Sequence, residues 1–174
     1  MRETVYVGVS VDGFLARRNH KWDFLMQDGA EPPPGFEEFL ASVDTLVMGR
    51  NTFEAVRGME PWPYGKTPVV VLSSREVDFS GLKGVRIERM SGTPQEVVAK
   101  LEAKGLKHLY IDGGITIQRF LSAGLINRLI VTRVPVLIGD GIPLFGPLPH
   151  DVKLKHVKTT EYPDGAVRSE YEVG

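Results

Sequence analysis

Short apolar runs recur along the chain at the length of buried β-strands. Five of them are nearly continuous in valine, leucine, isoleucine and other apolar residues, and they lie at residues 5–9, 45–48, 69–72, 108–111 and 129–134. Strands that are apolar on both faces are typical of parallel sheets covered by helices on each side. The pattern therefore predicts an α/β fold built on a largely parallel sheet.

Amphipathic helices are predicted between these strands. After the three prolines at 32–34, apolar residues recur at i, i+3, i+4 and i+7 over residues 36–43, which forms one stripe of a helix. A second helix is expected over residues 94–105, because it begins with proline and is followed by glycine. A third is expected over residues 115–123.

The last part of the chain has a different pattern. Two runs, at 154–160 and 167–173, are joined by Pro163-Asp164-Gly165, which predicts an antiparallel hairpin. No linker, repeat or low-complexity segment divides the sequence, so we expect a single domain over residues 1–174. Residues 17–35 form the one long irregular stretch, and its aromatic residues are more typical of a binding loop than of a disordered one.

Three strand ends carry groups that can bind an anion. Gly113-Gly114 stands before a predicted helix, where free amides and a positive helix end favour a phosphate, although two glycines can equally turn a tight corner. Gly49-Arg50 precedes Asn51 and Glu54, whose spacing predicts a capping box at a second helix start. Ser73-Ser74-Arg75 ends a third strand with hydroxyls and a guanidinium. Because ligands of open α/β sheets bind at the carboxyl ends of strands, the three together favour a phosphorylated dinucleotide.

The amino-acid composition excludes several classes of function for this protein. The 174 residues hold 21 Lys and Arg against 22 Asp and Glu, so no basic field favours nucleic acid as the main partner. Cysteine is absent, which excludes disulfides, thiolate zinc sites and thiol nucleophiles. The four histidines never take an i, i+3 or i, i+4 spacing, and we expect no metal site. The sequence shows no signal-peptide pattern and no apolar run of the ~20 residues needed to cross a bilayer, so we expect a cytoplasmic protein with no membrane partner.

Five segments of the chain follow an order that resembles the dihydrofolate reductase superfamily. They are Val9-Ser10-Val11-Asp12-Gly13-Phe14-Leu15-Ala16, Val47-Met48-Gly49-Arg50-Asn51-Thr52-Phe53-Glu54, Val71-Leu72-Ser73-Ser74-Arg75, Ile111-Asp112-Gly113-Gly114, and Leu137-Ile138-Gly139-Asp140-Gly141 with Leu144-Phe145. The resemblance is closer to the C-terminal reductase domain of bifunctional riboflavin biosynthesis enzymes, and it covers nearly the whole chain. It implies a dihydrofolate reductase-like fold: a central, mostly parallel eight-stranded sheet flanked by helices, with an antiparallel C-terminal hairpin and NADPH across the strand ends.

The resemblance also implies which residues contact NADPH. Those expected on the diphosphate side are Gly49, Arg50, Thr52, Gly113, Gly114, Ile115 and Thr116, with Arg50 also near the 2′-phosphate. Those expected around the adenosine 2′-phosphate are Ser73, Ser74 and Arg75, which implies NADPH rather than NADH. Those expected beside the nicotinamide and its ribose are Leu15, Ala16 and Ile117.

The substrate side departs from the family's pattern. Dihydrofolate reductases carry an acidic residue on the first long helix, one turn before an inward aromatic residue, and the corresponding positions here hold Pro32 and Gly35. Folate reduction is therefore disfavoured. The candidate substrate contacts are Asp12, Asp23, Tyr6, Phe36 and Phe39, the three aromatic residues as the lining of the pocket. The sequence assigns no residue to proton transfer.

We therefore expect an NADPH-dependent reductase that transfers hydride to a small heterocyclic, ribosyl-pyrimidine or pterin-like substrate, similar to the 5-amino-6-(5-phosphoribosylamino)uracil reductase of riboflavin biosynthesis. Two alternatives stay open: a true dihydrofolate reductase, and a non-catalytic nucleotide-binding protein. The resemblance also implies a homodimer that pairs through the sheets and the C-terminal ribbon. The expected partner surface lies near residues 128–136 and 154–160, where a sheet edge would otherwise stay open.

Overall fold

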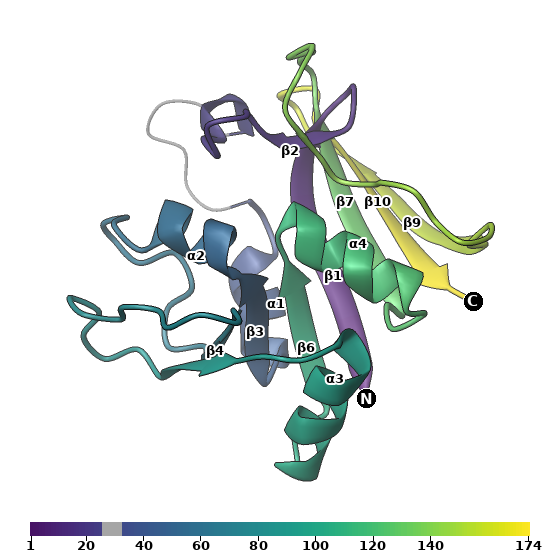
Figure 1. The fold of residues 1–174 in the computed structure, drawn as a ribbon. Helices are drawn as coiled ribbons and strands as arrows, with labels where there is room; N and C mark the ends of the chain where they lie inside the picture. Colours follow the sequence, from purple (N-terminus) through teal and green to yellow (C-terminus); the bar gives the residue numbers. More distant parts are fainter. Residues whose placement is uncertain (26–32) are drawn as a thin grey trace.

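The computed structural model describes residues 1–25 and 33–174. Its strands are β1 (Arg2–Ser10), β2 (Phe14–Ala16), β3 (Thr45–Gly49), β4 (Val69–Leu72), β5 (Ile87–Met90), β6 (His108–Asp112), β7 (Arg128–Val134), β8 (Ile142–Pro143), β9 (Leu154–Glu161) and β10 (Val167–Val173). Its helices are α1 (Phe36–Ser42), α2 (Arg50–Val56), α3 (Pro94–Ala103) and α4 (Gly114–Ser122), with a short 3-10 turn at Asp23–Leu25 (Figure 1).

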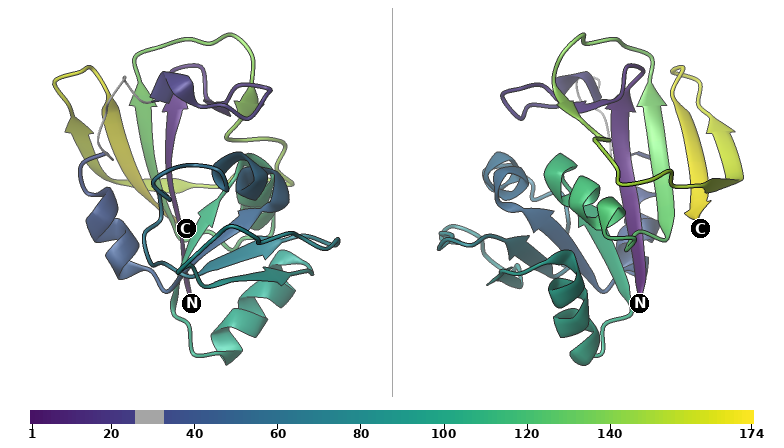
Figure 2. Two further views of the ribbon diagram at one scale, coloured as in Figure 1. Left: turned by 90° about the vertical axis from the view of Figure 1, so that its left-hand side faces the viewer. Right: turned by 45° about the vertical axis from the view of Figure 1, so that its right-hand side comes forward.

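One twisted sheet organises the molecule. Its eight strands have the order β5-β4-β3-β6-β1-β7-β10-β9. The neighbours from β5 to β7 are parallel, whereas β10 runs antiparallel to both β7 and β9. The small antiparallel pair β2-β8 lies beyond the end of β1 (Figure 1 and Figure 2). The predicted α/β fold, with a mostly parallel eight-stranded sheet and an antiparallel C-terminal pair, is confirmed.

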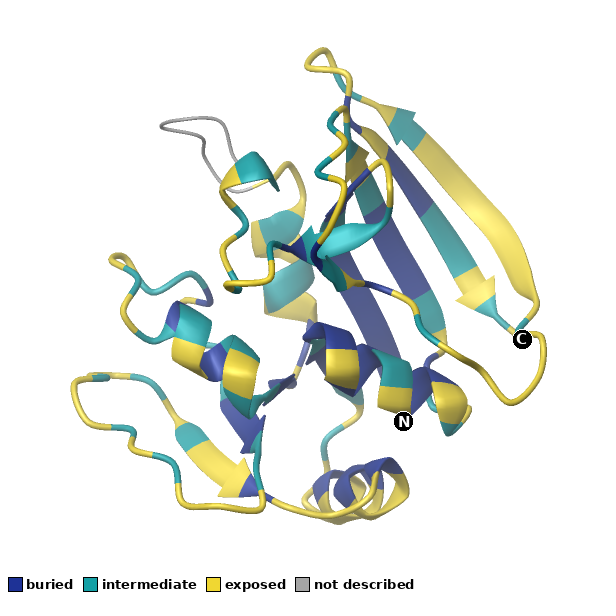
Figure 3. Cartoon of the chain, turned by 45° about the horizontal axis from the view of Figure 1, so that its top comes forward, coloured by how far each residue is buried: buried dark blue, intermediate teal, exposed yellow. Residues whose placement is uncertain are grey.

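Helices cover both faces of the sheet. Alternate residues of a strand point to opposite faces, and β1 shows this directly. Val5, Val7 and Val9 pack with side chains of α3 and α4, whereas Tyr6 belongs to a second cluster that contains side chains of α1 and α2. The central strands are therefore buried on both sides, as their continuous apolar runs predicted (Figure 3).

The helix starts follow the sequence prediction only in part. The capping box predicted at Asn51 and Glu54 is wrong, because α2 begins at Arg50, directly after β3, and has no side-chain cap. Asn51 therefore already lies in the first helical turn. A capping box precedes α3 instead: Thr93 Oγ1 accepts the Glu96 N–H at 3.2 Å, and Glu96 Oε2 accepts the Thr93 N–H at 2.8 Å.

The outermost strand on the C-terminal side is β9. It is exposed along nearly its whole length (Figure 3), and its pairing with a second copy of the chain stays a prediction. Pro32, which the sequence places in the proline stop before α1, lies outside the described residues. In residues 1–25 and 33–174, no helix is both long enough and apolar enough to cross a membrane.

Candidate functional site

The three predicted anion-binding junctions lie at one edge of the sheet. In the sheet register, Gly49 at the end of β3 is opposite Leu72 of β4, and Met48 is opposite Asp112 at the end of β6. Because the three strands are parallel neighbours, their carboxyl ends and the residues that follow them share the same edge (Figure 1). The structure therefore brings together junctions that are up to 64 residues apart in the sequence.

Two glycines hold the starts of α2 and α4 in contact. A Cβ on Gly49 would lie 2.9 Å from Thr116 Oγ1, and a Cβ on Gly113 would overlap the Thr52 hydroxyl. Gly113 also has a φ of 95°, where a residue with a side chain is strained. A side chain at either position would have to displace a threonine, and at Gly113 it would also be strained. We call the four residues Gly49, Thr52, Gly113 and Thr116 the glycine interlock.

The first turn of α4 supplies backbone donors beside the glycine interlock. The amides of Gly114, Ile115 and Thr116 have no acceptor within the helix, because their i−4 carbonyls lie before its start. Ile115 is 65% exposed although it is apolar, whereas Ile117 is fully buried. Leu15 of β2 lies close to Gly114, 3.5 Å from the position of a Cβ there. A helix start with free amides suits the diphosphate of a dinucleotide.

The turn after β4 presents its polar groups to solvent. Ser73 Oγ donates to the Arg75 carbonyl oxygen at 2.8 Å and accepts the Arg75 N–H at 3.1 Å. Arg89 Nη1 donates to the Ser73 carbonyl oxygen at 3.1 Å, and Ser74 and Arg75 are exposed. Among the residues that the structure describes, no carboxylate lies within ion-pair distance of Arg75 or Arg50. Both guanidinium groups are available to a phosphate.

Asp112 places a carboxylate directly beside the glycines. Its Oδ1 accepts the Gly113 N–H at 2.8 Å, and its Oδ2 accepts from the Tyr64 hydroxyl at 3.4 Å. Burial raises the pKa of the Asp112 carboxyl to about 6, although both hydrogen bonds oppose that rise. Burial and the nearby Asp112 carboxylate raise the pKa of Tyr64 well above 10. A carboxyl group that titrates near pH 6 can hold or release a proton at this edge.

The aromatic residues predicted to line the substrate pocket form one cluster with Tyr110. The ring centroids lie 4.7 Å apart for Tyr6 and Phe39, which are stacked, and 5.5 Å apart for Tyr6 and Phe36. Phe39 and Tyr110 are in edge contact at 5.0 Å, and the Tyr110 hydroxyl donates to the Tyr6 carbonyl oxygen at 2.9 Å. The structure thus brings Tyr6, Phe36 and Phe39 together on the α1 face of the sheet.

The two candidate loop carboxylates already have partners. Asp12 accepts the backbone N–H groups of residues 138–139 at 3.3 and 2.8 Å, and the Ser10 hydroxyl together with these groups lowers the pKa of Asp12. Asp23 accepts from Nε and Nη2 of Arg17 at 2.8 and 3.2 Å, and this pairing lowers the pKa of Asp23. Both side chains are exposed and ionised at neutral pH, and their contact with a substrate stays a prediction.

Tyr64 is a site residue that the sequence reasoning did not single out. It lies in the loop after α2, where it packs edge to face against Trp62 with ring centroids 5.4 Å apart. The sequence feature that could have drawn attention to Tyr64 is its position directly after Pro61-Trp62-Pro63. Its contact with Asp112 spans 48 residues, so only the fold reveals that the two belong to one site.

Comparison with known proteins assigns the chain to a family. The RibD C-terminal domain family model matches residues 4–168. The chain belongs to the RibD C-terminal domain family. A crystal structure from Shewanella sp. PV-4, whose name assigns it to riboflavin biosynthesis, is 35% identical to this RibD C-terminal domain. It superposes with a TM-score of 0.91 and covers 100% of this chain and 99% of the other.

Two more distant structures share the fold of this RibD C-terminal domain. One is the diaminohydroxyphosphoribosylaminopyrimidine deaminase/5-amino-6-(5-phosphoribosylamino)uracil reductase of Thermotoga maritima, 14% identical with a TM-score of 0.78, covering 99% of this chain and 56% of that one. The other is dihydrofolate reductase from Enterococcus faecalis complexed with NADP(H), 17% identical with a TM-score of 0.67, covering 99% and 96%. They confirm that the fold is dihydrofolate reductase-like.

Replacing Gly113 by alanine is expected to lower the free energy of unfolding of this RibD C-terminal domain by about 2–4 kcal/mol. Backbone strain at φ 95° adds to the overlap with Thr52. The matched control is Gly105→Ala, where φ is 85° but no atom lies within 4 Å of the Cβ, so strain alone should cost about 1–2 kcal/mol. Urea denaturation measures both variants, and equal losses would contradict the glycine interlock.

Asp112→Asn is expected to change how the stability of the domain depends on pH. The native pKa of about 6 lies above the ordinary value of 3.8, so the native state binds this proton more tightly than the unfolded chain does. The carboxyl therefore costs stability as the pH rises from about 4 through about 6, and a neutral amide does not. Relative to wild type, the variant should gain on the order of 2–3 kcal/mol between pH 4 and pH 7.5. Urea denaturation at both pH values measures this gain, and a difference that is the same at both would refute it.

Proposed function

We propose that this protein is an NADPH-dependent reductase that transfers hydride to a small heterocyclic, ribosyl-pyrimidine or pterin-like substrate. The observation that carries the proposal is the convergence of the glycine interlock, the α4 amides and the turn at 73–75 on one sheet edge. A dinucleotide needs backbone donors for its diphosphate and a cation for a 2′-phosphate, and this edge offers both. The reductases among the structures of the same fold support the choice of chemistry.

The residues of this edge would hold the two ends of the cofactor. When bound, NADPH supplies the hydride, and the protein contributes binding and orientation. In this proposal the first-turn amides of α4 bind the diphosphate, and Ile115 packs against the cofactor. The turn at 73–75 binds the 2′-phosphate through Arg75, while Leu15 and Ala16 border the nicotinamide.

Asp112 is the residue of this site best suited to hold a proton. Hydride addition to one atom of a double bond leaves an electron pair on the other atom, which must then take up a proton, so a reductase needs a proton source near its substrate. The pKa of about 6 lets Asp112 carry a proton in roughly one molecule in ten at pH 7, far more than an ordinary aspartate, and the Tyr64 hydroxyl orients its carboxyl group. Asp12 and Asp23 are poorer proton sources because the pKa of each is lowered.

The aromatic cluster favours a flat substrate, and the residues of α1 disfavour dihydrofolate as that substrate. Tyr6 and Phe39 stack on each other, and the half-buried rings of Phe36 and Phe39 leave aromatic surface against which a flat ring can pack. Glu37 and Glu38 of α1 are exposed, and Gly35 before the helix carries no side chain. This supports a reductase that acts on a ring other than dihydrofolate. NADPH oxidation on addition of pterins and ribosylaminopyrimidines distinguishes the reductase from a non-catalytic nucleotide-binding protein.

Arg75→Ala is expected to weaken NADPH binding by about 10- to 100-fold and to leave NADH binding unchanged, because only NADPH offers a phosphate to this guanidinium. The matched control is Arg86→Ala, which removes the same charge from an exposed position before β5. Cofactor fluorescence titration measures all four affinities. A parallel loss of NADH binding, or the same loss in Arg86→Ala, would contradict the assignment of the 2′-phosphate.

A further inference from the structure

A groove of about 380 Å³ lies between α1 and the C-terminal strands β7, β10 and β9. Its lining includes Tyr6, Phe39, Arg128, Tyr162, Arg168 and Glu170. Val5 is opposite Ile111 in the sheet register, so Tyr6 lies level with Asp112 at the end of β6, and the rest of the lining extends from there across β7, β10 and β9. The groove therefore begins at the aromatic cluster and lies on the β9 side of the edge assigned to NADPH.

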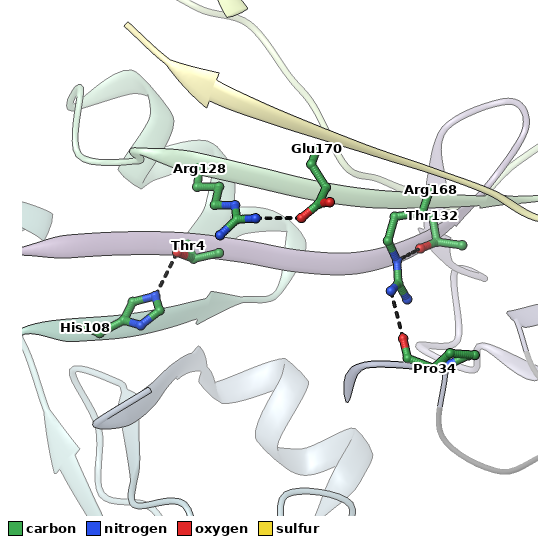
Figure 4. Close-up of polar contacts among 7 residues, drawn as sticks. All are labelled: Thr4, Pro34, His108, Arg128, Thr132, Arg168 and Glu170. Atoms are coloured by element: carbon green, nitrogen blue, oxygen red, sulfur yellow. Dashed lines mark hydrogen bonds and ion pairs between the residues drawn. The ribbon is translucent and has the colours of Figure 1, made fainter. Parts of the chain in front are cut away.

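Arg168 is buried in the wall of this groove, with only 8% of its surface exposed. Its Nε donates to Thr132 Oγ1 at 3.1 Å, and its Nη1 donates to the Pro34 carbonyl oxygen at 2.7 Å (Figure 4). The guanidinium carbon lies 4.9 Å from the ring centroid of Tyr6 and 5.4 Å from that of Tyr162. Its Nη2 is also buried and has no hydrogen-bond partner among the described residues.

No carboxylate in the described part of the chain balances this charge. Glu170, two residues along the same strand, is already bound to Arg128 at 2.6 Å (Figure 4). Glu38, the other acidic residue in the lining, is exposed at the groove mouth and makes no ion pair with Arg168. With Lys158 the lining holds three cations and two carboxylates, which leaves one positive charge in excess.

A purely structural role does not account for the whole side chain. The contacts of Arg168 tie Pro34, just before α1, to β7 and β10, and they use Nε, Nη1 and the face of the guanidinium. An arginine stays ionised in proteins, and a buried cation is costly unless it is paired and fully hydrogen-bonded. Among residues 1–25 and 33–174, neither the Nη2 protons nor the net charge has a partner, which is the condition that a bound anion would satisfy.

We infer that this groove binds a small planar carboxylate, such as a heterocyclic ring that carries one carboxyl group. The carboxylate supplies the missing charge and the acceptor for Arg168 Nη2. The ring lies against the aromatic side chains of Tyr6, Phe39 and Tyr162, which favour a flat partner. One excess positive charge matches a singly charged carboxylate better than a doubly charged phosphate. Because Tyr6 and Phe39 are also the aromatic residues of the proposed substrate site, the inference rests on the proposed function and names a chemical class for its substrate, while its binding test does not require the cofactor.

Orotate and uracil test this inference, because the two rings differ by one carboxylate. We expect orotate to bind the full-length protein and uracil to bind at least about tenfold more weakly, as measured by isothermal titration calorimetry. Arg168→Met should weaken orotate binding by at least about tenfold. The control Arg133→Met removes the same charge from an exposed position of β7 and should leave orotate binding unchanged.

A second variant tests the same charge balance without altering a buried residue. Glu38→Gln removes the exposed carboxylate at the groove mouth and should tighten orotate binding about two- to threefold. Equal binding of orotate and uracil, unchanged orotate affinity in Arg168→Met, or weaker binding in Glu38→Gln would each overturn the inference. NADPH affinity is measured in the same samples and should be unchanged in Arg168→Met. The failure of the cofactor proposal and the failure of this one are therefore distinguishable.

Discussion

The close contact between the starts of α2 and α4 is the constraint on which the candidate site depends. Parallel pairing of β3 and β6 brings two strand ends side by side, and each continues directly into a helix. The two helix starts can approach only because glycine stands at positions 49 and 113, each facing the threonine hydroxyl of the other element. The contact aligns the backbone donors of α4 with Arg50 and with the turn after β4. One steric requirement thus sets the geometry of a whole sheet edge.

The fold also carries two ionisable groups, Arg168 buried and Asp112 half-buried, that lack an opposite charge among the described residues. Asp112 has two hydrogen bonds but no cation, and Arg168 has two hydrogen bonds but no carboxylate. Each costs stability, and a core built only for stability would replace both with apolar residues. Their positions are informative for that reason. One lies beside the glycines of the sheet edge and the other lies in the groove next to the aromatic cluster, where each can act on a bound molecule.

The local pattern of apolar and polar residues was sufficient to predict most of the fold. The features that it did not predict depend on contacts between residues far apart in the sequence. The apolar runs of β1, β3, β4, β6 and β7 and the stripe of α3 follow directly from periodicity, because these elements are buried in the way that their sequences imply. The short strands β2, β5 and β8 carry too little pattern to be recognised. The junction at Gly113 was visible as a glycine pair, but its overlap with Thr52 depends on a residue that lies 61 positions earlier in the chain. The burial of Arg168 depends on Tyr6 and Thr132, which only strand pairing brings next to it.

Titration of ¹⁵N-labelled protein with NADPH, followed by amide chemical shifts, tests the shared sheet edge most directly. If the three junctions form one cofactor site, the amides of residues 49–52, 73–75 and 113–116 should shift together and saturate at the same NADPH concentration. The amides of β9, at the far end of the sheet, should not change. No shift at saturating NADPH, shifts confined to one of the three junctions, or shifts centred on β9 and β10 would contradict the site.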